Sequence, residues 1–143
     1  MLNLSGKVIG VSSRIVTWCN SARTDPVDCV QPDATLINIG TNDYSLGDPG
    51  PNYRLAMHKL INRVQSDFPG KPVYLIVSPM ITGTARDSQK KVLASLAGNN
   101  VSVLDLGQTE PGEGYGCDYH PDIATHARMS DALVKQLKRD LHW

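Results

Sequence analysis

The sequence lacks an excess of charge of either sign. Its 143 residues include 14 lysines and arginines and 14 aspartates and glutamates, and neither sign forms a long run. This balance gives no electrostatic reason to expect nucleic acid or an anionic membrane as a partner. No apolar segment is long enough to span a bilayer, and the first residues lack the basic region and apolar core of a signal peptide. As given, the sequence is expected to be soluble and cytoplasmic.

Cysteine is also scarce. The three cysteines, Cys19, Cys29 and Cys117, are too few and too widely spaced for a disulfide framework or a zinc knuckle. Cys19 and Cys29 could close a loop in an oxidising compartment, and free buried thiols are at least as compatible with the pattern. Neither a Gly-x-Gly-x-x-Gly pattern nor a P-loop occurs, which argues against a nucleotide-binding flavodoxin-like domain.

Short apolar runs alternate with segments of helical periodicity along most of the chain. Strands are expected at residues 34–39, 73–77 and 101–106, with a weaker candidate at residues 7–12. Helices are expected to begin at an Asn52 cap, at an Asp87 or Ser88 cap, and at Pro121, the last one burying a stripe that includes Ile123 and Ala127. This alternation predicts a parallel sheet with right-handed crossovers, in one domain spanning residues 1–143.

Small polar residues follow the central expected strand directly, in the order Gly40-Thr41-Asn42-Asp43. In an open α/β sheet, ligands bind beyond the carboxyl ends of the strands, so this turn is placed for chemistry. Gly40 lets the backbone approach a ligand closely, and the Asn42 carboxamide offers two uncharged N–H donors, which suit an oxyanion hole. The competing interpretation is a polar turn whose side chains satisfy only local backbone groups.

A histidine lies at the same predicted edge. His120 stands between a glycine-rich stretch, residues 107–119, and the start of the last helix. A neutral imidazole there is positioned as a general base. A lone histidine at a helix start is more often a surface residue, and His126 is interpreted as structural.

Together these blocks resemble the SGNH, or GDSL-type, hydrolases, and most closely the carbohydrate esterases of family two, which deacetylate polysaccharides. Residues 32–45 resemble the block of that family that bears its Asn, and Ser78-Pro79-Met80 resembles its Gly-Pro-Met segment. Residues 116–126 resemble its His block. The resemblance implies a flavodoxin-like three-layer sandwich with a short parallel sheet. It also implies that Asn42 is an oxyanion-hole donor and His120 the general base.

The His block departs from most SGNH enzymes at one position. Most place an Asp three residues before the His, where this sequence has Cys117. Family-two members also tend to lack that Asp and orient the His through a backbone carbonyl. The resemblance therefore implies a dyad rather than a triad, in which Asp118 acts through its carbonyl or, as a weaker alternative, its carboxylate.

The larger departure lies before Gly40, because the family's Gly-Asp-Ser nucleophile turn occurs nowhere in the sequence. In one alignment, Ile9-Gly10-Val11-Ser12 is a degenerate nucleophile turn. In the other, Ser5-Gly6-Lys7 belongs to the family's second block and the nucleophile strand is missing.

The family's sheet favours the first alignment. Its first strand lies beside the Asn-block strand, so losing it would leave unpaired backbone groups that cost on the order of 1–3 kcal/mol each. The only N-terminal strand candidate should therefore fill that place, with Ser12 or Ser13 at the catalytic end. Otherwise a second chain supplies the strand and the protein is an obligate homo-oligomer.

The resulting hypothesis is a serine esterase that acts on acetyl esters of small molecules or carbohydrates and needs no metal or cofactor. Ser12 is the expected nucleophile, with His120, Asp118, Asn42 and Gly40 completing the site. Asp43, Tyr44 and Tyr119 are expected to contact substrate. The rival is a carbohydrate-binding remnant in which Tyr44, Tyr115 and Tyr119 stack on sugar and no ester is cleaved.

Overall fold

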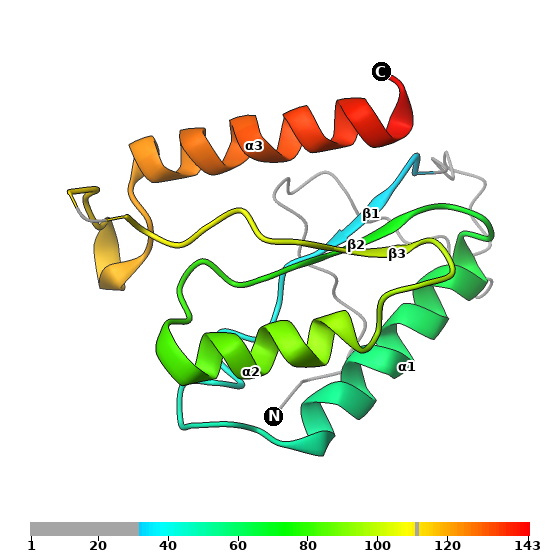
Figure 1. Cartoon of the computed structure of the whole chain (residues 1–143), viewed down its shortest axis with the longest axis horizontal. Helices are drawn as coiled ribbons and strands as arrows, with labels where there is room; N and C mark the ends of the chain where they lie inside the picture. The colour runs from blue at the N-terminus through cyan, green and yellow to red at the C-terminus, as the bar shows by residue number, and fades with distance from the viewer. Residues whose placement is uncertain (1–31, 111) are drawn as a thin grey trace, which may run out of the picture.

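Three parallel strands form the middle layer of the structure (Figure 1), a computed structural model that describes residues 32–110 and 112–143. The strands are β1 (Thr35–Ile37), β2 (Val73–Ile76) and β3 (Val101–Leu104), in the spatial order β1-β2-β3. Thr35 pairs with Val73, and Val73 pairs in turn with Val101. The expected strand at residues 7–12 lies outside the described residues.

Helices cover both faces of this sheet. The helices α1 (Pro51–Asp67) and α2 (Gly83–Ala94) lie on one face, and α3 (Ile123–Leu141) lies on the other (Figure 1). Every residue of β2 is buried, which explains why its sequence is an unbroken apolar run. The predicted three-layer α/β fold with a short parallel sheet is confirmed.

The two faces of β2 contribute to different layers, as the alternation of side chains along a strand requires. Val73 and Leu75 belong to the main apolar core, on the side of α1 and α2. Tyr74 points the other way, where burial and the nearby Asp140 carboxylate of α3 raise its pKa. The buried members of the main core are Ile37, Tyr44, Tyr53, Met57, Ile61, Val64, Val73, Leu75, Val77, Ile81, Leu93, Leu96 and Val101.

The expected helix caps were wrong for α1 and α2. Helix α1 begins at Pro51, whose missing N–H and fixed φ suit the first helical position, so Asn52 already lies inside the helix. Helix α2 begins at Gly83, four residues before the first expected cap. The Ser88 hydroxyl does not cap the helix and instead donates to the Asp48 carboxylate at 2.6 Å.

The expected stripe of α3 was also wrong in the first turns of that helix. Ile123 is 89% exposed and Ala127 is exposed, whereas Thr125 and Met129 are buried. The N-cap of α3 is Asp122, one residue after Pro121. Its carboxylate accepts a hydrogen bond from the Thr125 N–H at 2.8 Å. Within the described residues, no helix is both long and apolar enough to cross a membrane.

The turn after β1 is built on a glycine that has no room for a side chain. Gly40 has φ +120°, and a Cβ there would lie 2.6 Å from the Tyr53 hydroxyl oxygen and 2.7 Å from Gln89 Nε2. Its carbonyl accepts from the Tyr44 N–H at 3.0 Å, which closes the turn around Asn42. Both backbone conformation and close packing therefore require glycine at this position.

Replacing Gly40 by alanine should destabilise the fold more than the same change at Gly47. Gly47 has nearly the same φ, +116°, with no atom of the described residues within 4 Å of the added Cβ, so Gly47→Ala carries only backbone strain of about 1–2 kcal/mol. Gly40→Ala adds overpacking against two buried side chains, typically about 1–3 kcal/mol. Urea unfolding of both variants measures the difference, and equal losses of stability would contradict the packing described here.

Candidate active site

The loops that follow the three strands meet at one edge of the sheet, because the strands are parallel. Asn42 lies on the loop after β1, and His120 lies on the long loop between β3 and α3. The turn after β2, which begins at Ser78, lies between them in the strand order. The structure thus brings the predicted residues to one edge, although no hydrogen bond joins Asn42 to His120 within the described residues.

Asn42 lies in the Gly40 turn with its side chain exposed. The Asn42 backbone carbonyl accepts from the Ser45 hydroxyl at 2.7 Å. Its carboxamide is exposed and makes no hydrogen bond with any other described residue. Thr41, one residue earlier, fixes the turn to its neighbour, with its Oγ1 2.6 Å from Ser78 Oγ. No described residue therefore competes with a ligand for the side-chain N–H groups of Asn42.

The two residues after Asn42 differ in what they can offer a substrate. Asp43 is partly exposed at the rim of the turn. The Tyr44 ring is only 5% exposed and packs edge-to-face on Tyr53, with ring centroids 5.2 Å apart. This corrects the expectation that Tyr44 contacts substrate, because a ring in the core has no face left for stacking on a sugar.

His120 is exposed, and its ring is oriented by a backbone carbonyl. Its Nδ1 lies 3.1 Å from the carbonyl oxygen of Cys117, the first residue of the short 3-10 helix η1 (Cys117–Tyr119). A carbonyl oxygen only accepts, so Nδ1 carries the proton and Nε2, which bonds no other described residue, carries the lone pair. That tautomer is the one a general base needs.

The orienting contact corrects the role expected for Asp118. Neither its carbonyl nor its carboxylate bonds to the His120 ring within the described residues. Asp118 and Tyr119 instead have left-handed backbone, with φ of +55° and +58°, and this turn brings the Cys117 carbonyl back towards the ring. Left-handed backbone costs an ordinary residue on the order of 1 kcal/mol, so the loop stores strain beside His120.

An exposed aromatic pair lies next to His120. Tyr115 and Tyr119 are 61% and 79% exposed, and their ring centroids lie 6.2 Å apart in an edge-to-face arrangement. The loop is held closed beneath them, since the Gly116 N–H donates to the His120 carbonyl at 2.8 Å. The pair is an apolar surface within a few residues of the candidate base.

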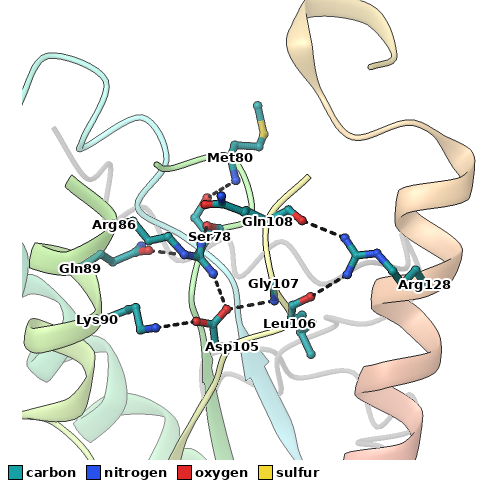
Figure 2. A network of polar contacts seen from close by, with 10 residues as sticks. All are labelled: Ser78, Met80, Arg86, Gln89, Lys90, Asp105, Leu106, Gly107, Gln108 and Arg128. Carbon is teal, nitrogen blue, oxygen red and sulfur yellow. Dashed lines mark hydrogen bonds and ion pairs between the residues drawn. The ribbon is translucent and has the colours of Figure 1, made fainter. Parts of the chain in front are cut away.

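A polar network joins the turn after β2 to the loop after β3. Arg86 of α2 donates to the Ser78 carbonyl at 2.7 Å and also bonds the Asp105 carboxylate. Burial by itself would raise the pKa of Asp105, but hydrogen bonds from Lys90 and the Gly107 N–H, with the Arg86 charge, hold it below its usual value. Figure 2 shows this network, drawn with Ser78, Met80, Arg86, Gln89, Lys90, Asp105, Leu106, Gly107, Gln108 and Arg128.

Arg128 of α3 continues the network into the long loop (Figure 2). It donates to the carbonyls of Leu106 and Gln108, at 3.3 and 2.8 Å. Its guanidinium also binds both carboxylate oxygens of Glu113, at 2.6 and 3.0 Å. Hydrogen bonds from Arg128 and from the Glu110 N–H lower the pKa of Glu113 to about 2. The loop that carries His120 is thus fixed to α3 by one side chain.

These polar anchors were not among the residues predicted from the sequence. Arg86 and Gln89 precede the buried Leu93 at helical spacing, so they continue its inward stripe towards the start of α2. That spacing is the signal in the sequence for these inward-facing positions, although polar residues in a helix usually face solvent.

The serines considered as nucleophiles from the sequence remain predictions. Ser5, Ser12 and Ser13 lie outside the described residues. Ser78 is fully buried, with its hydroxyl engaged by Thr41 and the Met80 N–H, so it is not available as a nucleophile. In the part of the chain that the structure describes, no group of three or more His, Cys, Asp or Glu residues could hold a metal ion.

Two curated proteins are similar to this chain. It is 30% identical over 120 residues to the cellulase/esterase CelE of Acetivibrio thermocellus, covering 78% of this chain and 15% of that protein. It is 26% identical over 121 residues to the acetylxylan esterase/glucomannan deacetylase of Cellvibrio japonicus, covering 79% and 32%. No protein-family model matches the sequence.

Solved structures give the same relationship. A family two carbohydrate esterase from Clostridium thermocellum, in complex with cellohexaose, superimposes with a TM-score of 0.70 at 31% identity, over 78% of this chain and 37% of that one. The family two carbohydrate esterase from Cellvibrio japonicus gives 0.67 at 25% identity, over 79% and 34%. The chain thus spans well under half the length of these relatives. Over about four fifths of its own length, it is a homologue of the carbohydrate esterases of family two and has their fold.

Proposed function

We propose that this protein is a serine esterase of the SGNH type that hydrolyses acetyl esters. The observation that carries the proposal is the His120 ring, held by the Cys117 carbonyl with Nε2 free, at the sheet edge that also bears Asn42. The similarity to esterases named above supports the same reaction class. Because the aligned part is a fraction of those proteins, the activity is a proposal for this chain.

The reaction proceeds in two halves. Ser12 Oγ attacks the ester carbonyl carbon while His120 Nε2 takes the hydroxyl proton, and the carbonyl oxygen becomes an oxyanion. The Asn42 carboxamide and the Gly40 N–H donate to that oxyanion. His120 then gives its proton to the departing alcohol, leaving an acetyl-serine. Water, deprotonated by His120, releases acetate and restores the serine.

Acetylated carbohydrate is the proposed substrate class. Two relatives are named as an acetylxylan esterase and as an esterase solved with cellohexaose. In this chain the exposed rings of Tyr115 and Tyr119 offer an apolar face to a sugar, and Asp43 offers a carboxylate to its hydroxyls. Tyr119 precedes His120 directly, so a sugar stacked there lies near the base.

The same exposed pair favours a second candidate function. A chain without a working nucleophile would still bind sugar through Tyr115 and Tyr119, as a non-catalytic carbohydrate-binding module. This candidate predicts binding to an oligosaccharide without ester cleavage.

Hydrolysis of p-nitrophenyl acetate by the pure protein, with and without a serine-directed phosphonate, separates the two functions. We expect hydrolysis that the phosphonate abolishes, and mass spectrometry should place the adduct on Ser12. An adduct on Ser13 or Ser5 would move the nucleophile to that residue. Absence of both hydrolysis and adduct, with xylo-oligosaccharide binding retained, would favour the binding module.

His120→Ala should lower kcat by about two to four orders of magnitude without unfolding the protein, because the residue is a base at an exposed position. His126→Ala is the matched control, since His126 is also exposed and lies on the same segment. Circular dichroism checks the fold of both variants. Equal losses of activity with both folds intact would show that the base is assigned wrongly.

Asn42→Ala should lower kcat about a hundred- to a thousandfold with little change in KM, as the loss of one oxyanion donor does. Stability should change little, because the carboxamide bonds no other described residue. Steady-state kinetics on p-nitrophenyl acetate measure both constants. A variant that keeps full kcat would show that Asn42 is not an oxyanion donor and that the Gly40 turn has only a local structural role.

A further inference from the structure

A buried polar cluster lies directly beneath the Gly40 turn. Its members are Tyr53 of α1, Ser78 at the end of β2 and Gln89 of α2, and all three are almost completely buried. They come from three separate elements, so the cluster forms only when the fold is complete. Buried polar groups are costly unless they are hydrogen-bonded, which makes the arrangement of these bonds specific.

Gln89 is the member that connects the others. Its Oε1 accepts from the Ser78 N–H at 2.9 Å. Because that backbone group can only donate, the orientation of the carboxamide is fixed and Nε2 faces the other way. There Nε2 donates to the Tyr53 hydroxyl at 3.2 Å and to the Ile39 carbonyl at 3.3 Å.

Tyr53 completes the set of bonds at the base of the turn. Burial raises the pKa of Tyr53 to about 12, so its hydroxyl keeps its proton and donates to the Ile39 carbonyl at 3.1 Å. The Ile39 carbonyl therefore accepts two hydrogen bonds, one from Tyr53 and one from Gln89. Ile39 is the residue before Gly40, at the point where the chain leaves the sheet and enters the turn.

The cluster holds the Asn42 turn from two sides. Below the turn, Gln89 Nε2 contacts the Gly40 backbone closely enough to exclude a side chain there. Beside it, Thr41 is bonded to Ser78, the residue whose N–H is held by Gln89. A shift of Gln89 would thus move both supports of the turn.

We propose that Gln89 is a positioning residue that sets the place of the Asn42 carboxamide at the candidate oxyanion hole. The proposal rests on the function proposed above for Asn42. An oxyanion donor acts over a distance of about 2.7–3.1 Å, and a displacement of about 1 Å can cost a hundredfold in rate. Gln89 touches neither substrate nor reacting atoms and acts only through the turn.

The kinetic test compares Gln89→Met with Leu93→Ala. Methionine keeps an unbranched chain of similar length and removes all three hydrogen bonds. Leu93 lies one turn further along α2, is equally buried, and bonds nothing in the turn, so its truncation loosens the helix without touching the supports of Asn42. Both variants are assayed on p-nitrophenyl acetate at a temperature where circular dichroism shows each of them folded.

We expect Gln89→Met to lower kcat by about ten- to a hundredfold with KM within threefold of wild type, while Leu93→Ala keeps kcat within threefold. Equal losses of kcat in the two variants would overturn the proposal, because they would show a general effect of loosening α2. If Gln89→Met does not fold, Gln89→Glu replaces it. As a carboxylate, that side chain keeps the acceptor for the Ser78 N–H and loses the donors to Ile39 and Tyr53, and the same expectation applies.

A second measurement does not depend on activity. In ¹H–¹⁵N spectra, the side-chain amide of Asn42 and the backbone amides of Thr41 and Asn42 should shift or broaden in the Gln89 variant and stay unchanged in Leu93→Ala. If the wild-type protein hydrolyses no ester, the proposed function fails and these spectra alone decide the role of Gln89. Unchanged Asn42 resonances in the Gln89 variant would overturn it.

Discussion

The backbone of Ser78 must form its hydrogen bonds away from water at the point where β2 ends. Its N–H and its carbonyl are both bonded by side chains of one helix, Gln89 and Arg86 of α2. A buried backbone group without a partner costs about 1–3 kcal/mol, so these two contacts fix α2 against the sheet edge. The same two side chains also bond the loops on either side, Gln89 at the Ile39 carbonyl and Arg86 at the Asp105 carboxylate.

From Ser78 the contacts extend to both neighbouring loops. Thr41 joins the first loop, and Arg86 with Asp105 joins the third. The loops of an α/β protein are its least regular parts, yet here each is held by charged or amide groups that lie on or under the sheet edge. Contacts of this kind restrict the positions of irregular loops, which is what a functional site built on loops requires.

The layers of the fold were predictable because they depend on periodicity, and their details were not. The apolar run of β2 and the spacing along α1 reflect burial directly, so sheet and helices could be predicted. The Asn52 cap failed because Pro51 already begins α1, and the Ser88 cap failed because α2 begins at Gly83 and the Ser88 hydroxyl bonds Asp48. Gln89 resembled a solvent-facing residue, and the Cys117 carbonyl that orients His120 has no signature in the sequence, since every residue has a carbonyl.

The contacts of Arg128 with the long loop determine which loop positions tolerate substitution. Arg128 binds two backbone carbonyls and the carboxylate of Glu113, so among these contacts only Glu113 is a side chain of the loop. The exposed residues between Gly114 and Tyr119 can therefore be exchanged without removing the anchor, provided that the backbone follows the same path. Substitutions on this segment can therefore change the exposed surface beside His120 while Arg128 keeps the loop attached to α3.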